Sequence, residues 1–195
     1  MDIIEKIKNR ALDLSVPIIR DGGAEILTAL LRERRCAKIL EIGTGVGYSG
    51  ALMLSAAKNA SLVTVEIDGV FAELARSFFR EAGLEKRVRL IEGDATEAVL
   101  LMDGGFDFIL LDGPKGQYER LRPYLVGLLN PGGIIFADNA LFKGYVEDFY
   151  IRRKHRSIVK SLKAFIENMR NDARFRTTLS DAGDGILIAE YIKTE

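Results

Sequence analysis

Residues 38–50 read KILEIGTGVGYSG, a short apolar run that passes directly into a cluster of glycines. A run that is apolar on consecutive residues is typical of a strand buried on both faces in a parallel sheet. Gly43, Gly45 and Gly47 allow the backbone to turn tightly and to approach a ligand closely at the carboxyl end of that strand. This stretch therefore predicts the first strand of an α/β fold, followed by a ligand-binding loop.

The same rhythm of a short apolar run and a helical stretch continues to about residue 138. The later runs are SLVTVEI (61–67), RVRLIEG (87–93), FDFILLD (106–112) and GGIIFAD (132–138). This alternation is typical of a doubly wound, mostly parallel sheet with helices on both faces. Towards the end of the chain, two further strand-like runs flank the turn-forming sequence DAGDG, which predicts an antiparallel pair at the sheet edge.

The length of 195 residues suits a single domain, with N-terminal helices in residues 1–35 and the core in residues 36–195. No apolar run is long enough to span a bilayer, and the charged N-terminus does not resemble a signal peptide. We therefore expect a cytoplasmic protein with no membrane partner. The apolar face of residues 2–14 predicts a dimer contact or, alternatively, a cover for the protein's own core.

The chain has one cysteine, Cys36, and one histidine, His155, and these counts exclude several kinds of site. A lone cysteine excludes an internal disulfide framework, and the pair together cannot supply the ligands of a zinc site. Any catalytic triad would have to use His155, which lies in the basic run YIRRKHRS. If a metal is present, oxygen atoms must bind it, which favours a hard cation such as Mg²⁺.

Polar residues stand at the ends of the first three predicted strands. A carboxylate at Glu66 can accept both hydroxyls of a ribose, and Asp94 or the Ala95 amide can meet an adenine edge. Taken alone, either carboxylate is explained as well by capping of the following helix. Glu41 precedes the glycine loop, and Tyr48 stands where the third glycine of a dinucleotide-binding motif belongs, which disfavours an NAD-dependent oxidoreductase.

A second polar cluster follows the fourth and fifth predicted strands. Asp112 ends one strand, and Asp138 with Asn139 ends the next. Because adjacent strands end at one rim of the sheet, two carboxylates and one amide come together there. These groups form half a coordination shell for Mg²⁺ or another divalent cation, with positions left for water and substrate. The alternative is that Asp138 and Asn139 only cap the turn that follows them.

The segments EIGTGVGYSG, VEID, EGDA, FILLDGPKGQY and LLNPGGIIFADN resemble the class I S-adenosylmethionine-dependent methyltransferases. Within that class they are most similar to the metal-dependent O-methyltransferases related to catechol and caffeoyl-coenzyme A O-methyltransferases. The resemblance covers roughly residues 20–192. It implies a seven-stranded sheet with a reversed last strand, a homodimer, and O-methylation of a small catechol-like acceptor. It also implies that Asp112, Asp138 and Asn139 are metal ligands and that Lys115 is the general base. Lys115 and Asp112 are then the expected catalytic residues.

With S-adenosylmethionine as the implied cofactor, the expected contacts fall at the ends of the first four strands. They are Glu41, Gly43, Thr44, Gly45, Gly47, Tyr48, Ser49, Glu66, Ile67, Asp94, Ala95 and Asp112. Tyr48 and Ser49 are expected near the methionine part, although a packing role explains Tyr48 equally well. The short N-terminal extension and the missing insertion between strands leave the acceptor undecided.

Residues 151–176 carry nine basic and two acidic side chains, although the whole chain is neutral. Arg152, Arg153, Lys154 and Arg156 can contact the phosphates of RNA or of a coenzyme A ester, or they form a solvated helix start. Bacterial relatives that resemble this chain methylate a 5-hydroxyuridine in tRNA, and the LFKGYV and RRKHR segments are similar to theirs. An enzyme that modifies tRNA is therefore the alternative to one with a small acceptor. A non-catalytic cofactor-binding module is disfavoured by Lys115 and the candidate ligands.

Overall fold

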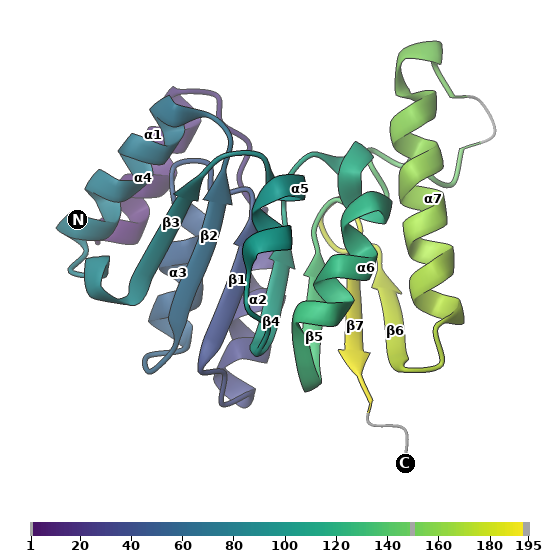
Figure 1. Ribbon diagram of the computed structural model, residues 1–195. Coiled ribbons are helices and arrows are strands. Elements are labelled where there is room, and N and C mark those ends of the chain that lie inside the picture. Colours follow the sequence, from purple (N-terminus) through teal and green to yellow (C-terminus); the bar gives the residue numbers. More distant parts are fainter. Residues whose placement is uncertain (1, 149–150, 193–195) are drawn as a thin grey trace.

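The computed structural model describes residues 2–148 and 151–192 and contains a seven-stranded sheet (Figure 1). The strand order is β3-β2-β1-β4-β5-β7-β6. The strands are β1 (Lys38–Ile42), β2 (Ser61–Glu66), β3 (Val88–Glu92), β4 (Phe106–Leu111), β5 (Leu129–Ala137), β6 (Phe175–Ser180) and β7 (Ile186–Tyr191). β1 to β5 pair in parallel, whereas β7 pairs antiparallel with both β5 and β6. The predicted doubly wound sheet with an antiparallel last strand is confirmed.

The strand order reverses beside β1, which pairs with β2 on one side and β4 on the other. The connections from β1 and β4 therefore leave the sheet in opposite directions. In an open α/β sheet, ligands bind in the crevice that this divergence leaves at the carboxyl ends of the strands. The sheet thus predicts a binding site after Ile42 and Leu111, the last residues of the two strands.

Helices cover both faces of the sheet (Figure 1). One face carries α1 (Ile3–Asp13), α2 (Asp21–Glu33), α3 (Tyr48–Ala56) and α4 (Gly69–Glu81), and the other carries α5 (Ala95–Ala98), α6 (Tyr118–Leu128) and α7 (Arg156–Asn171). Side chains alternate along β1, so that Ile39 joins the first core and Leu40 the second. No helix in the described part of the chain is long and apolar enough to cross a membrane.

The N-terminal helix α1 packs on the protein's own core. Ile7 and Ala11 are fully buried in the same cluster as α3 and α4, so the covering role expected as one alternative is confirmed. Leu12 of this helix and Leu14, directly after its end, remain exposed. A homodimer stays a prediction.

Three helices are joined to 3₁₀ turns. The turn Val99–Leu101 follows α5, and the turn Lys115–Gln117 comes directly before α6. The turn Arg153–His155 comes directly before α7. Helix ends commonly tighten in this way because their first and last turns lack full hydrogen bonding.

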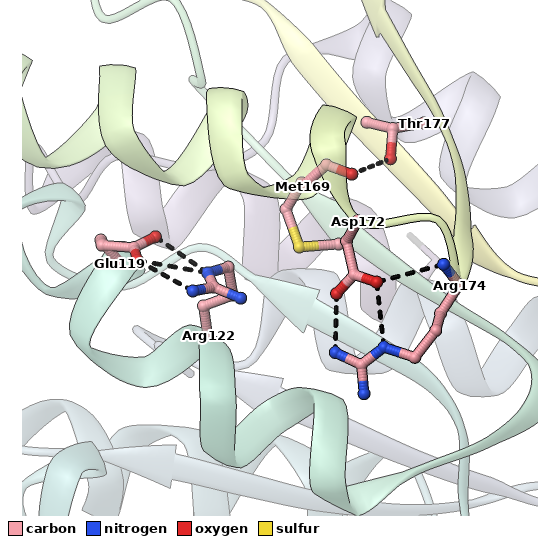
Figure 2. Close-up of polar contacts among 6 residues, drawn as sticks. All are labelled: Glu119, Arg122, Met169, Asp172, Arg174 and Thr177. Atoms are coloured by element: carbon pink, nitrogen blue, oxygen red, sulfur yellow. Dashed lines mark hydrogen bonds and ion pairs between the residues drawn. The ribbon is translucent and has the colours of Figure 1, made fainter.

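Figure 2 shows polar contacts within α6 and between α7 and β6, and one further hydrogen bond joins α6 to α7. The Arg122 guanidinium donates to both carboxylate oxygens of Glu119 within α6, at 3.0 and 3.2 Å. Asn168 of α7 donates to the same carboxylate at 2.7 Å, and the Thr177 hydroxyl of β6 donates to the Met169 carbonyl at 2.8 Å. These contacts join α7 to its neighbours; Arg156 begins α7, and Arg152, Arg153 and Lys154 come just before it.

Candidate active site

The glycine loop after β1 lies directly against the segment that follows β4. Gly43, Gly45 and Gly47 all have positive φ, at 97°, 53° and 89°. A Cβ atom on Gly43 would lie 2.7 Å from the carbonyl oxygen of Asp112, closer than side chains allow. The tight turn predicted from the sequence is confirmed, and at Gly43 the fold tolerates only glycine.

A cavity of about 310 Å³ opens at the carboxyl ends of β1, β2 and β4. Its volume is at the lower end of the range for small-molecule sites, roughly 300–1,000 Å³. Ten of the twelve predicted cofactor contacts line it: Gly43, Thr44, Gly45, Tyr48, Ser49, Glu66, Ile67, Asp94, Ala95 and Asp112. Lys115 lines the same cavity, so the predicted cofactor contacts and the predicted general base share one space.

The cavity has one wall that the sequence analysis missed. Val16, Pro17 and Ile18, from the segment between α1 and α2, line it together with the residues at the strand ends. Val16 is largely buried, and its side chain lies 3.5 Å from where a Gly45 Cβ would be. These residues are far in sequence from the glycine loop, and only Pro17, which breaks the helical pattern, marked the segment.

Glu41 was predicted to contact the cofactor, but its carboxylate lies beneath the cavity and is fully buried. It accepts hydrogen bonds from the Ser49 hydroxyl at 2.5 Å and from the Thr64 hydroxyl at 2.6 Å. Burial raises the pKa of Glu41 to about 8, against the opposing effect of these two hydrogen bonds. Glu41 therefore reaches the cavity through Ser49 and not directly. Gly47 also lies outside the lining, where it packs against Phe79.

Glu66 lines the cavity and accepts hydrogen bonds from the backbone on either side of it. One carboxylate oxygen accepts from the Gly45 N–H at 2.7 Å, and the other accepts from the Asp68 N–H at 2.9 Å. Each carboxylate oxygen has a second acceptor position, so the group can still receive hydroxyls from a ligand.

Asp94 lines the cavity and also caps α5. Its carboxylate accepts from the N–H and the hydroxyl of Thr96, both at 2.7 Å, and these bonds lower the pKa of Asp94. The capping alternative raised from the sequence is therefore confirmed for Asp94, together with its place in the cavity wall.

The second polar cluster lies at the ends of β4 and β5, whose last paired residues are Leu111 and Ala137. Burial, followed by the charge of Asp112, raises the pKa of Asp138 to about 6. Burial also raises the pKa of Asp112, and the nearby Lys115 ammonium opposes that shift. Asn139 follows with a left-handed backbone, φ 52°, which asparagine tolerates.

These side chains fit a hard divalent cation by their chemistry. All three offer oxygen donors, and a cation would neutralise two shielded carboxylates that repel each other. Among residues 2–148 and 151–192, no group of three or more histidine, cysteine, aspartate or glutamate side chains is arranged to hold a metal ion. A site here would therefore depend on the Asn139 amide as its third protein ligand.

The start of α7 packs against the turn that carries Lys115. Ile158 of α7 packs 3.8 Å from where a Gly116 Cβ would be, next to Lys115. Arg152, Arg153, Lys154 and Arg156 are exposed just before that point in the chain. The His155 ring stacks on Tyr145 with centroids 5.2 Å apart and meets Phe142 edge-on at 5.4 Å. Residues 149–150, directly before the basic segment, lie outside the described residues.

Comparison with known proteins agrees with this geometry. A family model described as O-methyltransferase matches residues 4–192. A protein of Mycobacterium sp. (strain JLS), named as an O-methyltransferase, is 30% identical over 190 residues, which cover 96% of this chain and 85% of the relative.

Two solved structures have the same fold. One from Staphylococcus aureus, named as a caffeoyl-CoA O-methyltransferase, has a TM-score of 0.90 at 27% identity, covering 98% of this chain and 93% of the other. The other is the O-methyltransferase TomG of Streptomyces achromogenes in complex with S-adenosylmethionine. It has a TM-score of 0.89 at 25% identity, covering 99% and 91% of the two chains.

Proposed function

The chain belongs to the O-methyltransferase family, and we propose that it transfers the methyl group of S-adenosylmethionine to a hydroxyl of an acceptor held beside a divalent cation. One observation carries this proposal: the cavity lined by the predicted cofactor residues also contains Asp112 and Lys115. The site for the methyl donor and the site for the acceptor therefore meet at the end of β4. In the TomG structure, S-adenosylmethionine is bound by a protein of the same fold.

The chain's own residues divide the work of binding the cofactor. Glu66 receives the ribose hydroxyls, and Asp94 and Ala95 meet the adenine edge at the end of β3. Ser49, held by Glu41, faces the methionine part from the start of α3. The bound cofactor supplies an electrophilic sulfonium methyl group. The protein's contribution is to hold the acceptor oxygen in line with that group, an effect of positioning.

Asp112, Asp138 and Asn139 would hold the divalent cation, which would lower the pKa of an acceptor hydroxyl and orient it. To act as the general base, Lys115 must first release a proton from its ammonium group to water; its Nζ atom, 3.1 Å from the Asp112 carboxylate, can then take the hydroxyl proton. A small acceptor with two neighbouring hydroxyls, such as a catechol, offers both the metal-binding oxygen and the reacting oxygen.

The test is methyl transfer from radiolabelled S-adenosylmethionine to a panel of catechols, with and without EDTA. We expect turnover that EDTA abolishes and Mg²⁺ restores. Undiminished turnover of a catechol in the presence of EDTA would refute the requirement for a divalent cation. Saturable cofactor binding without methyl transfer to any catechol would refute a catechol-like acceptor.

A second candidate acceptor, 5-hydroxyuridine in tRNA, is favoured by the aromatic and basic side chains around the start of α7. The Tyr145 and His155 rings stack on each other, and the exposed basic side chains of Arg152, Arg153, Lys154 and Arg156 lie just before or at the first residue of α7. Nucleotides are recognised in this way, by stacking on rings and by charge contacts to phosphates.

The matched experiment compares two triple variants. Replacing Arg152, Arg153 and Arg156 with glutamate should abolish salt-sensitive binding of tRNA that contains hydroxyuridine. Replacing Arg10, Arg32 and Arg80, exposed on α1, α2 and α4, makes the same charge change elsewhere and serves as the control. Equal loss in both variants, or none in either, would exclude this surface as the tRNA site.

A further inference from the structure

Tyr118, the first residue of α6, joins the ends of β4 and β5 next to the proposed metal ligands. Its side chain is fully buried, and its hydroxyl lies 2.9 Å from the Leu111 carbonyl oxygen and 3.2 Å from the Asp138 carbonyl oxygen. A tyrosine hydroxyl has one proton to donate, so the two carbonyls share it in a three-centre hydrogen bond. The hydroxyl thus links the residue before Asp112 with Asp138 itself.

This link lies where the two strands separate. Pairing of β4 with β5 ends at Leu111 and Ala137, and the Asp138 N–H still donates to the Leu111 carbonyl at 3.0 Å. The Asp112 N–H turns to the other side and donates to the Ile42 carbonyl of β1 at 2.9 Å. The Tyr118 hydroxyl therefore adds a connection at the point where the two aspartates leave the sheet.

The ring of Tyr118 is held independently of its hydroxyl. It meets the Phe165 ring of α7 edge-on, with centroids 5.6 Å apart and planes at 71°. The turn Lys115–Gln117 comes directly before it, closed by the Gln117 N–H donating to the Pro114 carbonyl at 2.9 Å. One short segment thus carries the proposed base at one end and the hydroxyl link at the other.

The geometry points to Tyr118 as a positioning residue that holds Asp112 and Asp138 at the separation a divalent cation requires, an inference that rests on the proposed metal site. Two shielded carboxylates at neighbouring strand ends repel each other, and without a restraint they would move apart. Mg²⁺ demands near-ideal octahedral geometry, whereas Ca²⁺ accepts more varied arrangements. Loss of the restraint should therefore weaken Mg²⁺ binding more than Ca²⁺ binding.

The experiment uses Tyr118→Phe, which keeps the ring and its contact with Phe165 and removes only the hydroxyl. The control is Tyr124→Phe on the same helix, where the side chain is 44% exposed. Mg²⁺ and Ca²⁺ are titrated calorimetrically into each protein saturated with S-adenosylhomocysteine, and the affinity for S-adenosylhomocysteine is measured alongside. We expect Mg²⁺ affinity to fall about 10- to 100-fold in Tyr118→Phe, as for other residues that orient metal ligands. Ca²⁺ affinity should fall less, and S-adenosylhomocysteine affinity should not change.

The outcomes separate this inference from the function on which it rests. Wild-type Mg²⁺ affinity in Tyr118→Phe would overturn the positioning role while leaving the metal site intact. A parallel loss of Mg²⁺ and S-adenosylhomocysteine affinity would show a general structural role and would also overturn it. If the wild-type protein bound neither Mg²⁺ nor Ca²⁺, the metal site itself would fail, and the inference with it.

Discussion

The Nζ atom of Lys115 lies 3.1 Å from a carboxylate oxygen of Asp112, and both side chains are largely shielded from solvent. Asp112 belongs to the cofactor cavity and also neighbours Asp138 at the next strand end. This ion pair therefore lies in the wall of the cofactor cavity, beside the next strand end. Under the proposed function, the short loop after β4 would contact the methyl donor, the cation and the acceptor hydroxyl.

Replacing Lys115 with methionine should lower kcat by roughly 10²- to 10⁴-fold, the usual contribution of a general base. S-adenosylhomocysteine affinity should change little, because the lysine is proposed to act on the acceptor. The control is Lys58→Met, at an exposed position after α3. Turnover of Lys115→Met equal to that of the control would rule out the base.

Replacing Gly43 with alanine should destabilise the protein by roughly 3 kcal/mol or more, because the added methyl group meets the Asp112 backbone and φ is positive. Gly83→Ala is the matched control: its φ is 67°, but nothing lies within 4 Å of the added atom. That variant isolates the backbone strain, about 1–2 kcal/mol. Urea unfolding measures the loss of unfolding free energy in both variants. Equal losses would contradict a steric clash between the added methyl group and the Asp112 backbone.

The buried Glu41 should make stability fall as pH rises. The pKa of Glu41 is about 8 in the folded protein, which is above its value in the unfolded chain. At any pH between these two pKa values, folded Glu41 keeps a proton that the unfolded chain has released. Stability from this group is present at low pH and is lost as pH rises towards 8. Urea midpoints between pH 6.5 and 8 should therefore fall less steeply in Glu41→Gln than in wild type or in the exposed control Glu33→Gln. An unchanged slope in Glu41→Gln would contradict a protonated Glu41.

Replacing Glu66 with alanine should weaken S-adenosylhomocysteine binding by about 1.5–3 kcal/mol, the range for a hydrogen bond to a charged group. Because Glu66 also braces Gly45, the comparison needs a ligand that lacks the ribose hydroxyls. Calorimetry should find the Glu66→Ala effect largely absent with that analogue. The same loss with both ligands would mean that Glu66 only supports the loop.

Most of the site could be predicted because parallel strands end at one edge of a sheet. The runs before Gly43, Glu66, Asp94, Asp112 and Asp138 were recognisable as strands, and their ends had to lie close together. The burial of the Glu41 side chain could also have been predicted from the sequence. Two residues after the buried Ile39, it shares a face of β1 with that residue and so points into the core, not along the strand end.

Other features depend on contacts between distant segments. Val16 reaches the cavity only because α1 and α2 fold across α3, and nothing near it in sequence resembles a binding motif. Tyr118 reads as an ordinary residue at the start of a helix. Its hydroxyl gains a role only when β4 and β5 bring the Leu111 and Asp138 carbonyls together.

The central claim is that methyl transfer requires a divalent cation held by Asp112, Asp138 and Asn139. The most direct measurement is the methyl-transfer rate of metal-stripped protein as Mg²⁺ is added back, using the acceptor that reacts best in the panel. Wild type and Asp138→Asn are compared, since Asp138 lies outside the cofactor cavity lining. We predict that Mg²⁺ restores the wild-type rate but not that of Asp138→Asn, with equal S-adenosylhomocysteine affinity in both. A metal-stripped wild type that turns over at its full rate would contradict the claim.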